Sequence, residues 1–184
     1  MSVRTAGLAR YVLPAAGLLL VAAQTPLSAG VALTEGHFDD PFAYCETVGT
    51  INAPDGRYVG PAMPEAVVRG LKAALALPAD VSTEQLRNNS IWRCMNGQLY
   101  ACTVGANLPC AEKADTRREP AAAVADFCRR NPDADIIPMA VTGRATVFEW
   151  RCAGAIPAIA RQVAQPDASG YLANIWYPID PAMR

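Results

Sequence analysis

The sequence predicts an α+β domain, an antiparallel sheet of about five or six strands with two helices packed on it, stapled by disulfides. Segments in which apolar residues alternate, as they do in strands, are interspersed with segments that have a helical period. One Asn-Gly pair lies between two strand-like segments, which is the strongest short hairpin signal. All six cysteines lie after the N-terminal segment, and an even number of cysteines is typical of a domain held together by disulfides.

The N-terminal segment, residues 1–32, has the features of an export signal. Two arginines precede an apolar run over residues 11–23, which is shorter than the ~20 residues of a membrane-spanning helix. Small residues suited to cleavage follow, and we favour cleavage after Ala32, although Ala23 fits nearly as well. The alternative is an uncleaved N-terminal anchor, because the uncharged stretch continues well past the apolar run.

Residues 33–184 have the length of a single α+β domain. Hydrophobic residues make up 52% of the chain, which predicts a packed core, and the net charge is only −1 at pH 7. With so mild a charge and no basic patch, we expect no nucleic-acid partner, and membrane contact only if the signal is uncleaved. The signal predicts a bacterial protein that is periplasmic or secreted.

An even number of cysteines behind an export signal predicts a disulfide framework, since oxidising compartments rarely leave six thiols free. No Cys-x-x-Cys spacing occurs, which removes the signature of redox sites and zinc knuckles, and the sequence predicts no metal or cofactor. The cysteines form the disulfide site of the prediction: Cys45, Cys94, Cys102, Cys110, Cys128 and Cys152.

The pairing is predicted from spacing and from a faint internal repeat. Cys102 and Cys110 are close enough to close the short loop between them. An aromatic residue directly precedes Cys45 and Cys128, and Trp-Arg-Cys occurs at both residues 92–94 and 150–152. By this similarity, we expect the pairs Cys45–Cys94, Cys102–Cys110 and Cys128–Cys152.

The first half of the domain is predicted to contain a strand, a helix and a hairpin. Residues 42–50 are expected to form a short strand, followed by a turn. The first helix should span residues 64–76, where Pro64 suits the first helical position and Gly70 weakens the interior. Ser82 and Gln85 form a possible capping box for a short helical turn.

The hairpin over residues 92–104 should turn at Asn96-Gly97, so that Cys94 faces Leu99 and Cys102 faces Ile91. Side chains alternate along a strand, so Cys94 and Cys102 then point to opposite faces and do not pair.

The second half is predicted to form a helix and a three-stranded meander. The helix spans residues 119–130, and Asn131-Pro132 ends it. Strands follow from residue 144, over residues 159–163 and over residues 171–177.

Candidate chemistry is sparse. The single histidine, His37, has no predicted partner. Carboxylates at Asp39-Asp40, Asp55 and Glu65 belong to turns and helix starts, where such residues are ordinary. Residues 131–135 resemble the start of a calcium loop but lack its required glycine and final glutamate.

The aromatic residues of the predicted strands either pack in the core, which is the commoner fate of such side chains, or line a binding surface, where aromatic side chains dominate. The leading hypothesis is therefore a non-catalytic binding or interaction module that recognises a protein, peptide or glycan of the cell envelope. The alternative is a small cell-envelope hydrolase that uses carboxylates, and the third option is an envelope stability factor without a discrete ligand. The possible binding surface comprises Trp176, Tyr177 and Tyr171.

Overall fold

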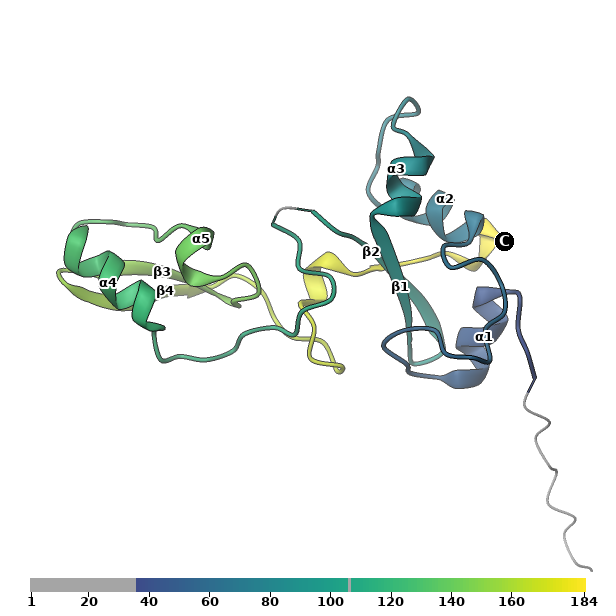
Figure 1. The fold of residues 1–184 in the computed structure, drawn as a ribbon, viewed down its shortest axis with the longest axis horizontal. Helices are drawn as coiled ribbons and strands as arrows, with labels where there is room; N and C mark the ends of the chain where they lie inside the picture. Colours follow the sequence, from purple (N-terminus) through teal and green to yellow (C-terminus); the bar gives the residue numbers. More distant parts are fainter. Residues whose placement is uncertain (1–35, 106) are drawn as a thin grey trace, which may run out of the picture. The chain divides into compact units, whose positions relative to one another are not determined.

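The structure is a computed structural model that describes residues 36–105 and 107–184, so the predicted signal over residues 1–32 lies outside it. The α+β class is confirmed (Figure 1). Within the described residues the strands form two antiparallel sheets, one in the order β1-β2-β5 and one of β3 and β4. Each sheet has fewer strands than the single sheet expected from the sequence. The elements are α1 (Pro41–Val48), α2 (Glu65–Ala74), α3 (Thr83–Asn88), β1 (Ser90–Met95), β2 (Gln98–Thr103), α4 (Ala122–Arg130), α5 (Met139–Thr142), β3 (Phe148–Ala153), β4 (Ile156–Gln162), the 3₁₀ turn Ala173–Ile175, β5 (Tyr177–Pro178) and the 3₁₀ turn Pro181–Met183.

The β1–β2 hairpin has the predicted register. Asn96 and Gly97 form its turn with φ angles of 53° and 78°, the left-handed conformation that an Asn-Gly turn supplies. Cys94 lies opposite Leu99, and Ile91 lies opposite Cys102, as the sequence predicted. Cys94 and Cys102 therefore point to opposite faces of the hairpin.

The two faces of this hairpin supply two hydrophobic cores. Trp92, Cys94 and Leu99 contribute one face to a first core that they share with α1 and α2. Cys102 contributes the other face to a second core, shared with α4, β3 and residues 171–176. Because side chains alternate along β1, Arg93 points away from the first core and is nevertheless fully buried.

The strand expected over residues 42–50 is wrong, because this segment forms α1. Asp40 caps the helix by accepting a hydrogen bond from the Phe42 N–H at 2.9 Å, and Pro41 occupies the first turn. A capping Asp followed by Pro is a helix-start signal. Here it starts a helix where a strand was expected from the sequence.

The third strand of the expected C-terminal meander is also wrong. Within residues 171–177, the chain forms the 3₁₀ turn, and then Tyr177 pairs with Ala101 of β2 rather than with β4. The contact with β2 continues at Ile179, which is fully buried in the first core and donates its N–H to the Leu99 carbonyl at 2.9 Å. Ile179 lies against Gly70 of α2, where a Cβ atom would collide with it, so the helix-weakening glycine has a packing role.

Among the remaining helices, α2, α3 and α4 agree with the prediction within a few residues, whereas α5 was not predicted. α2 lies inside the expected range 64–76, and Pro64 occupies the N-cap position, one residue before the first helical position where it was expected. At α3, the Ser82 side chain accepts a hydrogen bond from the Gln85 N–H at 3.3 Å. α4 ends at Arg130, before the expected Asn131-Pro132 stop.

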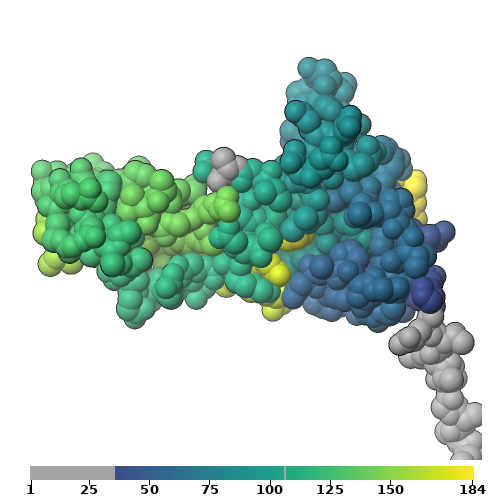
Figure 2. All heavy atoms as spheres, in the orientation of Figure 1, coloured from purple at the N-terminus to yellow at the C-terminus, as the bar shows by residue number. Residues whose placement is uncertain are grey.

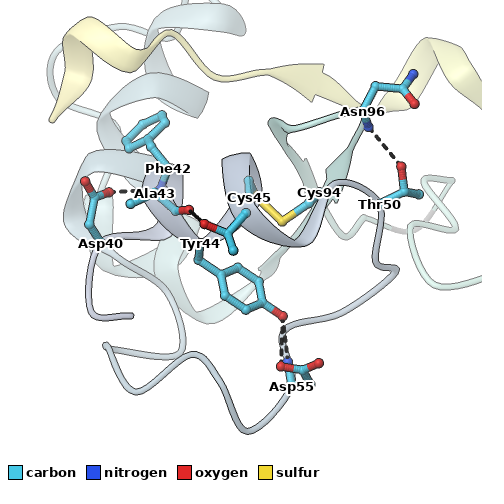
Figure 3. The surroundings of a disulfide bond; sticks show 10 residues. Asp40, Phe42, Ala43, Tyr44, Cys45, Thr50, Asp55, Cys94 and Asn96 are labelled. Carbon is cyan, nitrogen blue, oxygen red and sulfur yellow. Dashed lines mark hydrogen bonds between the residues drawn. A yellow bond between two sulfur atoms is a disulfide. The ribbon is translucent and has the colours of Figure 1, made fainter. Parts of the chain in front are cut away.

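All six cysteines form disulfides, in the three predicted pairs. Cys45–Cys94 joins α1 to β1, Cys102–Cys110 closes the loop after β2, and Cys128–Cys152 joins α4 to β3. Figure 3 shows that Cys45 and Tyr44 leave α1 in different directions. The Tyr44 hydroxyl donates to the Asp55 carboxylate at 3.2 Å and accepts from the Asp55 N–H at 3.0 Å. Three disulfides are typical of a protein in an oxidising compartment.

Arg93 is a buried cation held by residues from the C-terminal part of the chain. Its guanidinium lies 4.2 Å from the Trp176 ring centroid and 4.6 Å from that of Tyr171, and it forms an ion pair with Asp167. Nε and Nη1 have no hydrogen-bond partner among the described residues, so the two rings and one carboxylate balance the charge. Asp167 in turn accepts from the N–H groups of Ser169 and Tyr171.

Loss of the Cys45–Cys94 bond should destabilise the fold more than loss of Cys102–Cys110. The sequence separations are 49 and 8 residues, and the chain-entropy contribution grows with loop length. The double variants Cys45→Ala/Cys94→Ala and Cys102→Ala/Cys110→Ala should lower the free energy of unfolding by about 4 and about 2.5 kcal/mol, respectively. Urea unfolding measures both values, and the reverse order would contradict the expectation.

Asp167→Asn should lower the free energy of unfolding by about 3–5 kcal/mol, because it leaves the buried Arg93 charge without its partner. Burial alone would raise the pKa of Asp167, but the Arg93 hydrogen bond and the backbone N–H groups lower it overall. A lowered folded-state pKa stabilises the fold above the ordinary aspartate pKa of about 3.9, and this stabilisation is lost as the pH falls below that value.

Urea unfolding between pH 3 and 7 should therefore show a steeper loss of stability at low pH in the unmodified protein than in Asp167→Asn. Asp133→Asn is the matched control, because Asp133 is exposed and has no ion pair in the described part of the chain. Identical pH profiles for the unmodified protein and Asp167→Asn would show that the Arg93–Asp167 pair is not a source of stability.

Candidate functional site

A groove lined mainly by apolar residues lies beside β3. It has a volume of about 570 Å³, within the range of small-ligand sites. Its walls include the buried side chains of Phe148, Trp150, Leu172 and Ile175. We call this feature the β3 groove.

Three large apolar side chains lie exposed at the edge of the β3 groove. Ile136 is 63% exposed, Met139 is 49% exposed and Val163 is 44% exposed. They come from the segment before α5, from α5 itself and from the residue after β4. The segments that carry Ile136 and Met139 belong to the green surface of Figure 2. Apolar side chains clustered around one concavity mark an interaction site more often than isolated ones do.

Backbone hydrogen bonds and a disulfide hold the β3 groove in shape. The Ile137 N–H donates to the Trp150 carbonyl, and the Cys152 N–H donates to the Ala134 carbonyl, each at 2.8 Å. These bonds place the segment before α5 along the edge of β3. The Cys128–Cys152 disulfide also attaches α4 to this strand. The groove is therefore built on fixed elements and not on a free loop.

The charged residues of the groove lining are already paired. Arg144 forms an ion pair with Glu112 at 2.7 Å, and Glu149 pairs with Arg161 at 2.9 Å. The hydrogen bond from Arg161 lowers the pKa of Glu149. The β3 groove thus offers an apolar interior and no uncompensated charge to a ligand.

The three aromatic residues singled out from the sequence do not share an exposed face. Tyr171 and Trp176 are buried, and both rings contact Arg93. Tyr177 is half-buried and packs against the first core. None of the three aromatic residues lines the β3 groove. Leu172 and Ile175, which lie between Tyr171 and Trp176 in the sequence, do line it.

Sequence reasoning missed the residues at the edge of the groove. Ile136, Met139 and Val163 are separated along the chain and follow no helix or strand period. The available signal was the apolar run at residues 136–139, which directly follows a helix stop. Residues 131–135 form that stop, where the Asn131 side chain donates to the Phe127 carbonyl at 2.9 Å.

The acidic residues considered for hydrolysis have separate structural roles. Asp40 caps α1, and Glu65 forms an ion pair with Arg87. The hydrogen bond from Arg57 lowers the pKa of Asp55 to about 2, so this exposed carboxylate stays ionised at neutral pH. A general acid requires the opposite shift.

His37 is exposed and lies beside Asp55 and Arg57 in a shallow hollow of about 460 Å³. Among the residues that the structure describes, no group of three or more His, Cys, Asp or Glu side chains is arranged to hold a metal ion. No helix within residues 36–105 or 107–184 is long and apolar enough to cross a bilayer.

Comparisons with protein-family models, curated proteins and solved structures find no match to this chain.

Removing apolar side chains from the edge of the groove should reduce binding of an uncharged hydrophobic dye such as Nile red. The double variant Ile136→Asn/Met139→Gln should bind less dye, while its free energy of unfolding changes by less than about 1 kcal/mol, because both side chains are exposed. Ile156→Asn is the matched control, since Ile156 is 71% exposed but does not line the groove. Equal dye binding by the two variants would show that the dye does not report the groove.

Proposed function

We propose that this chain is an exported, non-catalytic binding module of the bacterial periplasm or the extracellular medium, and that its β3 groove holds a partner from the cell envelope. The observation that carries the proposal is the gathering of exposed Ile136, Met139 and Val163 around one apolar concavity. Water contact with such a cluster is unfavourable, and a bound partner removes it.

Export is supported by two independent features. The N-terminal segment has the basic start, apolar run and small residues of a signal peptide. The three disulfides fit a protein that acts outside the reducing cytosol.

Binding without catalysis is supported by the state of the acidic side chains. Asp55, Asp115 and Glu149 each receive a hydrogen bond from an arginine side chain that lowers the carboxyl pKa. Such groups remain anions at neutral pH, whereas a hydrolase that uses carboxylates needs one of them protonated. Among Asp55, Asp115 and Glu149, only Glu149 lines the β3 groove. Its charge is neutralised by the ion pair with Arg161.

Site-specific cross-linking tests this function in the intact cell envelope. A photoreactive phenylalanine analogue at position 139 should give a covalent adduct on illumination of cells that export the chain. The same analogue at position 156 should not, because Ile156 is exposed but lies outside the groove lining. No adduct from position 139, or equal adducts from both positions, would overturn the proposal.

A further inference from the structure

The chemistry of the groove lining narrows the kind of partner, and this inference rests on the function proposed above. We propose that the β3 groove binds an uncharged peptide segment with bulky apolar side chains, contributed by another protein.

The charges of the lining select against a charged ligand. Arg144 and Glu149 are paired with Glu112 and Arg161 outside the groove. A charged side chain entering the groove would lose its hydration and find no uncompensated opposite charge. A neutral segment avoids this cost.

The walls select for bulky apolar side chains. Phe148 and Trp150 present aromatic surface, and Leu172 and Ile175 present aliphatic surface. The volume of about 570 Å³ suits a short segment of chain and not a whole domain. Met139 at the edge has a flexible thioether side chain, which adapts to ligands of different shape.

The amide side chains of the lining distinguish a peptide from an acyl chain. Asn107 and Asn174 line the groove and are exposed. Neither side chain has a hydrogen-bond partner in the described part of the molecule. A carboxamide carries both donors and an acceptor, so it complements the N–H and C=O of a peptide group. A polymethylene chain offers neither, and would leave the two amides without a role in recognition.

The test measures binding of defined probes to the exported, oxidised protein by two-dimensional amide NMR. The first probe is the blocked peptide acetyl-Gly-Leu-Ser-Phe-Gly-amide, and the second has lysine in place of both its leucine and its phenylalanine. A third peptide carries glutamate at these two positions, and dodecyl maltoside below its micelle concentration is the acyl-chain probe. We expect saturable shifts around Met139 and Asn174 with the first peptide alone.

The variants connect binding to the groove. Met139→Glu should weaken binding of the neutral peptide by about tenfold, because it places a charge at the apolar edge. Ile136→Glu should act in the same direction, and Ile156→Glu should bind as the unmodified protein does. Thermal unfolding of each variant checks that its fold is intact.

Each outcome separates this inference from the proposed function. Binding of the detergent in place of the neutral peptide, equal binding of the charged peptides, or no binding of any probe would each overturn the peptide inference. Full affinity in both Met139→Glu and Ile136→Glu would also overturn it. In all these cases, the cross-linking experiment at position 139 still tests the proposed function independently. A lipid adduct at that position would support a binding module whose ligand is not a peptide.

Discussion

The burial of Arg93 is the constraint on which the rest of the structure depends. The β1–β2 hairpin is covered on both faces, so its central strand positions alternate between two interiors. Arg93 therefore brings a full positive charge into the second interior, where an unpaired ion would be very costly. Its neutralisation requires Asp167 and the Tyr171 and Trp176 rings, and this requirement returns the chain after β4 to the hairpin.

The same returning segment builds part of the candidate site. Tyr171 and Trp176 lie against the guanidinium, while their neighbours Leu172 and Ile175 line the β3 groove. The β3 groove and the rings that contact Arg93 are thus linked through the six consecutive residues 171–176. A change that weakens the Arg93–Asp167 pair acts on stability first, and on the groove through the displacement of these walls.

The sequence predicts best where the signal is local. Asn96-Gly97 defines the hairpin and its register, and the aromatic and Trp-Arg patterns next to the cysteines lead to the correct disulfide pairs. α1 was missed because its start signal, Asp40-Pro41, lies just before the segment 42–50 in which a strand was expected. The pairing of β5 with β2 depends on the burial of Ile179 beside Gly70, a contact between distant segments with no local signature. The groove edge was missed for the same reason, since Ile136 and Val163 come to line one groove only in the folded chain.

The order of the cysteines along the chain has a consequence for biogenesis. The disulfides join cysteines that are consecutive in the sequence, first with second, third with fourth and fifth with sixth. A polypeptide that is threaded N-terminus first through a membrane presents each thiol with its native partner as the next one to emerge. Oxidation in the order of emergence then produces the native bonds directly. The native connectivity therefore contains no bond between non-consecutive cysteines that would have to form by rearrangement.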